Sequence, residues 1–200
     1  MRTSFAVTWD YRCPFARNVH DHLVTALEAG GPWDVQFLAF SLDQPHVPEG
    51  EPSVFDRPEE FPGLLANEVG IVVRDRMPER FLAVHRAMFE ARHGAGADLR
   101  RREVIAPVLE GAGVAAGEVL AEVDSGWPLE SFRKEHLGAV EGHDVFGVPT
   151  FVVGERATFV RLMDRAAGDA GKAVSTINRI LDLLTGWPEL NELKDTRVTN

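Results

Sequence analysis

A proline interrupts what would otherwise be a good strand late in the chain. Residues 145–153 are almost entirely apolar and rich in β-branched and aromatic side chains, yet Gly147 and Val148 are followed by Pro149. Because proline has no N–H to donate to a β-ladder, its presence in such a run indicates an edge, a bulge or a cis peptide bond. The alternative is a strand that begins only at Thr150, after a proline in a loop.

The start of the chain has the pattern of a strand-helix-strand unit. Residues 5–9 are rich in strand-forming side chains and end at Asp10. Apolar residues then recur every three or four positions over residues 15–29, as in an amphipathic helix, and Pro14 suits the first helical turn. A second strand is predicted at residues 35–42. The short connections predict a right-handed β-α-β crossover.

The middle of the chain changes character twice. Residues 43–63 contain five prolines among acidic residues, which predicts an irregular segment that borders the functional site. From residue 64 to 137 the pattern is helical, most clearly at residues 80–92 and more weakly at 103–109 and 118–123, which indicates an inserted helical subdomain. Two further helices are expected at residues 158–167 and 173–184. This order predicts an α/β fold, a small sheet covered by helices on both faces.

Composition and charge exclude several classes of function. The chain has 200 residues, 44% of them hydrophobic and 26% charged, as expected for one soluble domain. Its formal net charge of −10 argues against nucleic acid and anionic membranes as partners. No apolar run approaches the roughly 20 residues of a membrane helix, and the N-terminus has no long apolar leader segment. We therefore expect a cytoplasmic protein.

The single cysteine, Cys13, directs attention to thiol chemistry. One cysteine excludes an intramolecular disulfide and a multi-cysteine metal cluster. Pro14 places Cys13 at or near the N-cap of the first helix, where unpaired N–H groups and the helix dipole favour the thiolate. Arg12 should act in the same direction and Asp10 in the opposite one, so the net pKa shift stays open. The alternative is a buried cysteine that only fills space.

Two motifs and their order carry a resemblance to a known family. Residues 9–16 read WDYRCPFA, residues 147–151 read GVPTF, and residues 81–89 form an apolar and aromatic pattern between them. Together they resemble the DsbA-like branch of the thioredoxin fold. They look most like its cytoplasmic relatives, the polyketide-associated dithiol oxidoreductases and the hydroxychromene-carboxylate isomerases with kappa-class glutathione transferases. The resemblance implies a thioredoxin-like domain of residues 1–62 and 138–200, with residues 63–137 as the inserted helical subdomain.

The resemblance also implies roles for single residues. Cys13 takes the place of the nucleophile and Pro149 that of the cis-proline facing its sulfur, while the backbone of Val148 would bind a thiol substrate in extended form. The further substrate- or thiol-binding residues that it implies are Tyr11, Arg12, Pro14, Phe15 and Ala16. Ala16 is also a departure, because the redox members have a resolving cysteine there that releases the substrate. The alanine is either natural or a replacement that would trap a mixed disulfide.

Three functions remain open at this point. The leading one is a thiol-disulfide oxidoreductase or monothiol transferase of the DsbA-like family that uses Cys13 as nucleophile. The second is a glutathione- or mycothiol-dependent transferase or isomerase of an aromatic substrate, although its relatives usually have serine at position 13. The third is a catalytically inactive binding module, which Ala16 favours.

The leading function sets expectations about cofactors and partners. No tightly bound cofactor is expected, only a low-molecular-weight thiol, glutathione or mycothiol, as co-substrate. The partner would be a small-molecule thiol or disulfide, or a protein disulfide. A homodimer is expected because kappa-like relatives are often dimers.

Other candidate residues favour structural roles. His20 and His22 lie on different faces of the first predicted helix, which favours a solvated pair over a metal site, and no metal is expected. His85 lies on a well-patterned helix and is expected to pack rather than to catalyse. Trp9 is expected in the core and Tyr11 at the rim of a pocket near Cys13.

Overall fold

The computed structural model describes residues 3–195 of the chain. A four-stranded mixed sheet and seven α-helices form its framework, and three short 3-10 turns follow the second strand. In chain order the strands and helices are β1 (Thr3–Trp9), α1 (Pro14–Glu28), β2 (Trp33–Ala39), α2 (Leu64–Arg76), α3 (Pro78–His93), α4 (Arg102–Gly111), α5 (Ala116–Asp124), α6 (Trp127–His143), β3 (Thr150–Val153), β4 (Arg156–Phe159) and α7 (Ala170–Gly186).

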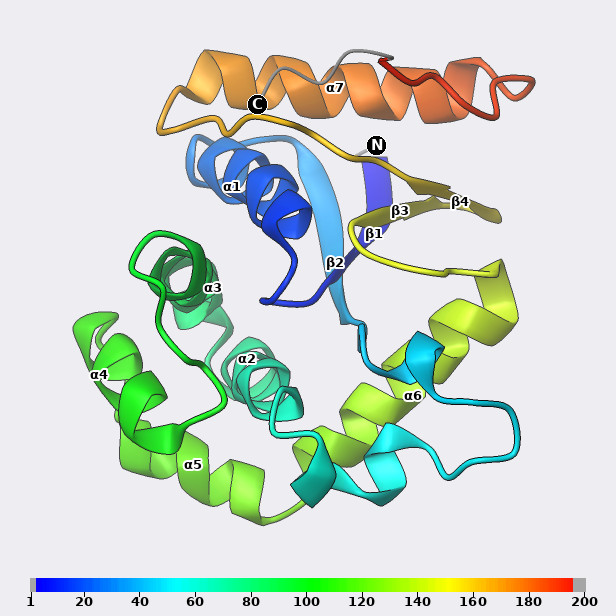
Figure 1. Cartoon of the computed structure of the whole chain (residues 1–200). Helices are drawn as coiled ribbons and strands as arrows, with labels where there is room; N and C mark the ends of the chain where they lie inside the picture. Colours follow the sequence, from blue (N-terminus) through cyan, green and yellow to red (C-terminus); the bar gives the residue numbers. More distant parts are fainter. Residues whose placement is uncertain (1–2, 196–200) are drawn as a thin grey trace.

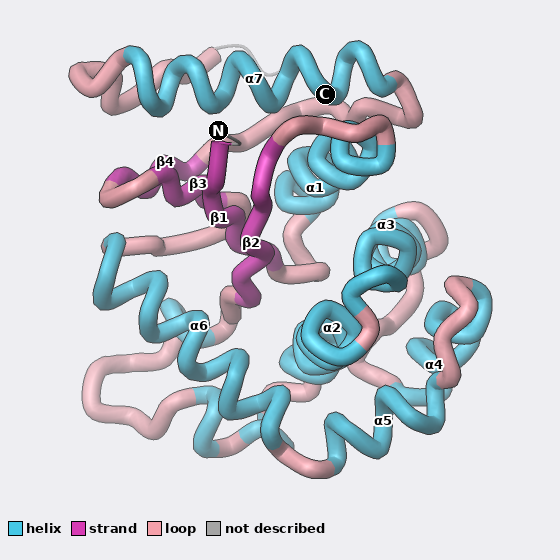
Figure 2. The backbone as a smooth tube through the Cα atoms, turned by 180° about the vertical axis from the view of Figure 1, so that it is seen from behind, coloured by secondary structure: helices cyan, strands magenta, loops and turns pink. Residues whose placement is uncertain are grey.

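The sheet has the strand order β2-β1-β3-β4. β1 and β2 pair in parallel, with Thr3 opposite Trp33 and Trp9 opposite Ala39, as the predicted β-α-β unit requires. β3 pairs antiparallel to β1, and β4 pairs antiparallel to β3. Figures 1 and 2 show α1 and α7 on one side of this sheet and α6 on the other. The prediction of an α/β fold with helices on both faces is confirmed.

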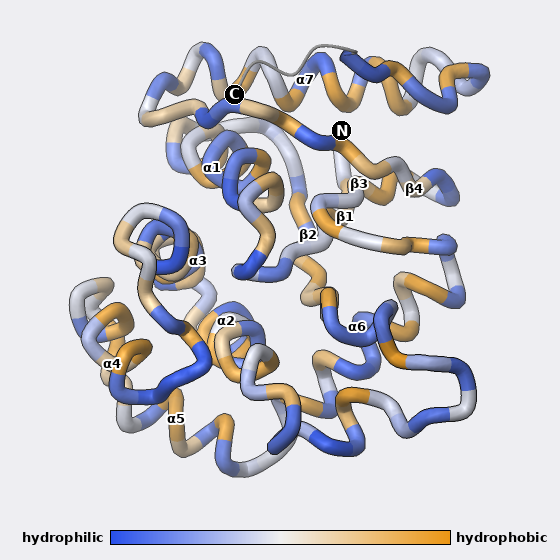
Figure 3. The backbone as a smooth tube through the Cα atoms, viewed as in Figure 1, coloured by the Kyte–Doolittle hydropathy of each residue, from blue (hydrophilic) through white to orange (hydrophobic). Residues whose placement is uncertain are grey.

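Burial explains why the strands and helices lie where they do. On β1, Phe5, Val7 and Trp9 alternate onto one buried face, where the Trp9 ring packs against Phe81 and His85 of α3. α7 packs along α1, and Figure 3 shows hydrophobic and hydrophilic residues alternating along it. Its N-terminus is capped by Asp169, whose carboxylate accepts a hydrogen bond from the Lys172 N–H at 2.9 Å.

Helices α2 to α5, and α6 as far as residue 137, fall within the predicted helical insertion of residues 63–137. Its helices match the predicted segments 80–92, 103–109 and 118–123, each lengthened by a few residues. α3 packs against α1, so the insertion adjoins the start of the sheet domain rather than standing apart from it. α6 runs from Trp127 to His143 and leads back to the sheet.

Two of the later expectations are corrected. The helix predicted at residues 158–167 is absent; residues 156–159 instead form β4, because pairing with β3 across a turn at Gly154 overrides the local helical pattern. The apolar run at residues 145–153 is a strand only from Thr150 onward. Before it, the Val148-Pro149 peptide bond is cis, one of the outcomes that the proline pattern predicted.

Candidate active site

Cys13 closes a short loop that joins β1 to α1. This nucleophile loop, residues 10–13, turns through a hydrogen bond from the Cys13 N–H to the Asp10 carbonyl at 3.0 Å. Cys13 is the N-cap of α1, with extended backbone angles, and its Sγ accepts a hydrogen bond from the Ala16 N–H at 3.4 Å. The sequence prediction of a thiol at this helix N-terminus is confirmed.

A second loop, residues 144–149, brings the cis-proline next to the thiol. Cys13 Sγ donates a hydrogen bond to the Val148 carbonyl oxygen at 3.4 Å, across 135 positions of sequence. This cis-proline loop is fixed from both sides, because the hydroxyls of Thr8 and Thr150 both donate to the Gly147 carbonyl. The Thr8 hydroxyl also accepts from the Thr150 N–H at 2.9 Å. The fold thus places the ends of β1 and β3 together around one sulfur.

The electrostatics of Cys13 favour the protonated thiol. Burial raises the pKa of Cys13, whose exposed fraction is 8%, and the N–H groups of Ala16 and Phe15 lower it less than burial raises it. Asp10 adds to the increase. The expected help from Arg12 is not found, because its guanidinium pairs instead with Asp10 at 2.8 Å and Asp43 at 2.7 Å.

Tyr11 starts a buried chain of hydrogen bonds. Its phenol donates to His85 Nδ1 at 2.8 Å, His85 Nε2 contacts His20 Nδ1 at 2.9 Å, and His20 Nε2 contacts the Thr8 carbonyl at 3.1 Å. Since a carbonyl can only accept, each imidazole donates through Nε2 and accepts through Nδ1. Burial lowers the pKa of His20 to about 4 and that of His85 well below its ordinary value, so both are neutral.

These contacts correct two expectations about side chains near the site. The Tyr11 side chain is fully buried and its phenol points to His85, so although the residue lines a hollow beside the nucleophile loop, its phenol does not lie on the rim. His20 and His22 are both buried rather than solvated; the His22 Nε2 lies 3.3 Å from the Asp164 carbonyl. The expectations that Trp9 lies in the core and that His85 packs are confirmed.

The helical insertion also holds the backbone of Tyr11. Its N–H donates to Asn67 Oδ1 at 3.4 Å, and its carbonyl accepts from His93 Nε2 at 2.9 Å. Gly70 lies so close that a Cβ there would be 2.7 Å from the Tyr11 hydroxyl oxygen. Sequence reasoning missed these three residues. A glycine inside a helical pattern was the available signal, because it often has a packing reason.

The other predicted residues differ in how accessible they are. Pro14 is exposed, Phe15 is half-buried beneath the Arg161 guanidinium, and Ala16 is fully buried. At position 16 a resolving cysteine would lie beside Cys13 Sγ, which the Ala16 N–H already contacts. Because Cys13 is the only cysteine in the chain, no second thiol can serve in its place.

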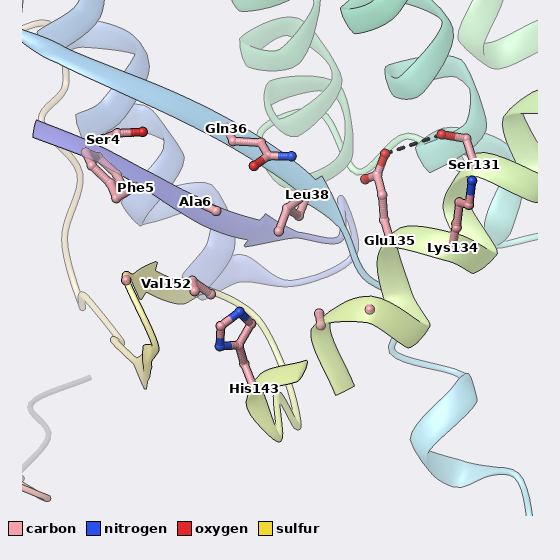
Figure 4. Close-up of a pocket in the computed structure, with 13 residues that line it drawn as sticks. Ser4, Phe5, Ala6, Gln36, Leu38, Ser131, Lys134, Glu135, His143 and Val152 are labelled. Atoms are coloured by element: carbon pink, nitrogen blue, oxygen red, sulfur yellow. Dashed lines mark hydrogen bonds between the residues drawn. The ribbon is translucent and has the colours of Figure 1, made fainter. Parts of the chain in front are cut away.

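Two hollows among the described residues bear on the position of the site. One, of about 360 Å³, flanks the nucleophile loop and is lined by Tyr11, Arg12, Gly63, Ala66, Arg92, Asp98, Leu99 and Arg100. A larger one, of about 520 Å³, lies between the sheet and α6 and includes Gln36, Lys134 and His143 (Figure 4). The larger hollow has no lining residue from the nucleophile loop or the cis-proline loop, so the smaller one is the relevant cavity for Cys13.

The family follows from a match over most of the chain. Residues 7–167 match the family model described as a DSBA-like thioredoxin domain. The chain belongs to the DsbA-like thioredoxin family. This confirms the family resemblance and the thioredoxin-like fold that the two motifs predicted.

Solved structures of this family share the fold at low identity. DsbA from Pseudomonas aeruginosa is 22% identical with a TM-score of 0.60, over 92% of this chain and 83% of that one. The cytosolic disulfide reductase DsbM from Pseudomonas aeruginosa, solved with GSH, is 18% identical with a TM-score of 0.58. The match covers 90% of this chain and 100% of that one. A 2-hydroxychromene-2-carboxylate isomerase is 16% identical with a TM-score of 0.61. The match covers 90% of this chain and 97% of that one.

Two further findings complete the comparison. No curated protein sequence gives a significant match to the chain. None of the helices within residues 3–195 is both long and apolar enough to cross a membrane.

Proposed function

We propose that the chain is a thiol-disulfide exchange enzyme in which Cys13 acts alone as the nucleophile. One observation carries this proposal: Cys13 Sγ lies between the N-terminus of α1 and the Val148 carbonyl, next to the cis peptide bond of Pro149. The family model supports it, because its match over residues 7–167 includes both Cys13 and Pro149.

The proposed step balances without a second cysteine in the chain. The Cys13 thiolate attacks one sulfur of a disulfide, a new S–S bond forms, and the other half leaves as a thiolate. An external thiol then attacks the mixed disulfide and returns Cys13 to its starting state. The N–H groups of Ala16 and Phe15 stabilise the sulfur anion at both stages. The backbone of Val148 would align an extended substrate beside the sulfur.

The co-substrate that we propose is a low-molecular-weight thiol of the glutathione or mycothiol type. A DsbM structure with GSH is among the structural neighbours, and its cytosolic origin supports a cytosolic location for this chain as well. A protein disulfide is the other proposed partner. Phe146 of the cis-proline loop is 72% exposed, with its ring centroid 5.5 Å from that of Phe159 in a tilted arrangement, and gives an extended peptide an apolar contact.

The test measures mixed-disulfide formation and its pH dependence. The reduced chain is incubated with glutathione disulfide and analysed by intact mass, and the alkylation rate of Cys13 is followed from pH 6 to 11. We expect one glutathione adduct per chain, removed by free thiol. Because burial raises the pKa of Cys13, the alkylation rate should rise with a midpoint above the ordinary thiol value of about 8.5.

The control is the Cys13→Ser variant, which should form no adduct. If the wild type forms no adduct even at a pH where alkylation is complete, Cys13 is not an exchange nucleophile. A midpoint below the ordinary value would instead contradict the dominance of burial in setting the thiol pKa.

A second candidate function has one observation in its favour. The protonated Cys13 thiol donates a hydrogen bond to Val148 and could equally donate to the thiolate of a bound cofactor, as expected for a thiol-dependent transferase or isomerase of an aromatic substrate. The fold shared with an isomerase agrees with this. Saturable glutathione binding to the Cys13→Ser variant would favour this function over exchange.

A further inference from the structure

We infer that the cavity beside the nucleophile loop binds the carboxylate of a small-molecule disulfide, with Arg92 as its recognition residue. This inference rests on the proposed exchange function and adds the class of substrate. The cavity volume of about 360 Å³ lies in the lower part of the range for ligand pockets, roughly 300–1,000 Å³.

The position of the cavity connects it to the chemistry. Tyr11 and Arg12 line it, and Arg12 directly precedes Cys13. Arg12 and Cys13 are neighbours in the nucleophile loop, with Cα atoms about 3.8 Å apart, so one wall of the cavity belongs to the loop that holds the nucleophile. The remaining walls come from the helical insertion: Gly63 and Ala66 from the start of α2, Arg92 from the end of α3, and residues 98–100 from the following loop.

The charges around the cavity distinguish its three arginines. Arg12 is neutralised by Asp10 and Asp43. Arg100 forms a two-point pair with Asp98, at 2.7 and 3.0 Å. Arg92 contacts only the Ala97 carbonyl, at 3.4 Å, and has no carboxylate within 4.0 Å among residues 3–195. Arg92 therefore has a guanidinium free to take a carboxylate in the two-point geometry that this group favours.

The walls suit the rest of such a molecule. Leu99 and Ala66 give the cavity apolar lining beside the arginines. Gly63 keeps its side of the cavity open, because a Cβ there would lie 3.1 Å from a guanidinium nitrogen of Arg12. Asn67, the residue after Ala66, has a buried Nδ2 with no acceptor among the described residues. In a chain of net charge −10, an anion must be recognised by such local contacts rather than by the overall field.

The experiment compares two disulfides that differ only in charge. 2,2′-Dithiodipyridine is neutral, whereas 6,6′-dithiodinicotinate has a carboxylate on each ring, and both release a thione whose absorbance gives the rate of reaction with Cys13. We expect Arg92→Gln to slow the carboxylate reagent about tenfold, the loss typical of one charge-assisted hydrogen bond. The rate with the neutral reagent should stay within about twofold of the wild type, because that reagent has no carboxylate for Arg92 to bind.

Controls separate the cavity from general charge effects. Arg101→Gln removes the same charge one residue away from Arg100, on a side chain that does not line the cavity, and should leave both rates unchanged. Arg92→Lys keeps the positive charge but loses the two-point geometry of the guanidinium. Its rate with the carboxylate reagent should therefore lie between those of Arg92→Gln and the wild type.

Each outcome bears on a different claim. If the neutral reagent fails to modify Cys13, the proposed exchange function fails. If it reacts normally while the carboxylate reagent is unaffected by Arg92→Gln, exchange stands and the carboxylate site is wrong. If Arg101→Gln slowed the reaction with the carboxylate reagent equally, the slowing would come from the loss of any nearby positive charge, and the site would again be wrong.

Discussion

At the scale of single residues, Tyr11, two positions before Cys13, is fixed by hydrogen bonds through each of its polar groups. Its phenol, N–H and carbonyl each bond to a different residue of the helical insertion, His85, Asn67 and His93. Gly70 leaves room for the phenol, with no space for a side chain. The position of Cys13 therefore depends on packing in α2 and α3, elements far from it in sequence.

The substitution Gly70→Ala tests this dependence. Its Cβ would lie 2.7 Å from the Tyr11 hydroxyl oxygen and 3.0 Å from a ring carbon, so either the ring or α2 must shift. We expect a loss of about 1–3 kcal/mol in the free energy of unfolding, as for overpacked cores, together with a changed rate of Cys13 alkylation. Urea unfolding and an alkylation time course measure the two effects.

Gly138→Ala is the matched control in α6. No atom lies within 4 Å of its added Cβ, so alanine should stabilise the helix by up to about 1 kcal/mol and leave alkylation unchanged. If the two variants behaved alike, Gly70 would have no packing role.

At the scale of elements, one carboxylate connects two helices to the sheet. Glu135 of α6 accepts hydrogen bonds from Arg74 of α2 at 2.5 and 2.9 Å and from the Ala39 N–H at the end of β2 at 2.7 Å. Arg74 in turn donates to the Phe37 carbonyl at 2.7 Å. This junction joins the helical insertion to the edge strand of the sheet.

Replacing Glu135 by alanine should weaken that junction. The Ala39 N–H and part of the Arg74 guanidinium lose their acceptor in a mostly buried place, at a cost of about 1–3 kcal/mol. Urea unfolding measures the loss. Glu141→Ala, an exposed residue of the same helix, should stay within about 0.5 kcal/mol of the wild type. A similar loss in both variants would mean that the junction contributes nothing specific.

At the scale of the whole molecule, buried titrating groups have opposite effects on how the free energy of unfolding changes with pH. Burial lowers the pKa of His20 and of His136 to about 4, so their contribution is present above the unfolded value of about 6.5 and is lost as the pH falls toward 4. Burial raises the pKa of Glu68 to about 7, so its contribution is present below its unfolded value and is lost as the pH rises toward 7.

The substitution Glu68→Gln separates the two contributions. Glutamine resembles the protonated acid, so the variant avoids the cost of ionising a buried carboxyl. We expect it to be more stable than the wild type at pH 8 by roughly 2–3 kcal/mol, with a steeper gain in stability from pH 4.5 to 7 because the histidines then act unopposed. Urea unfolding at each pH tests this. The exposed control Glu110→Gln should keep the wild-type profile, and an unchanged profile for Glu68→Gln would contradict the raised pKa.

The sequence predicted those features that depend on local signals. Cys13 beside Pro14 predicted the N-cap thiol, and Pro149 in an apolar run predicted a special peptide bond; both follow from the backbone chemistry of single residues. What it missed depends on long-range contacts. Residues 156–159 became a strand because β3 lies next to them, and Tyr11 and His20 are buried because α3 covers them. The pKa of Cys13 likewise depends on burial that no local pattern shows.

The attachment of Tyr11 to the helical insertion makes the nucleophile loop a product of cooperative folding. Its partners lie 56, 74 and 82 positions along the chain, while the Cys13 contact with Val148 spans 135. A fragment without α2 and α3 would keep Cys13 and Pro149 but lose the three residues that fix Tyr11. Local opening of the insertion would therefore release the loop without unfolding of the sheet, and the reactivity of one thiol would report on the integrity of both halves of the molecule.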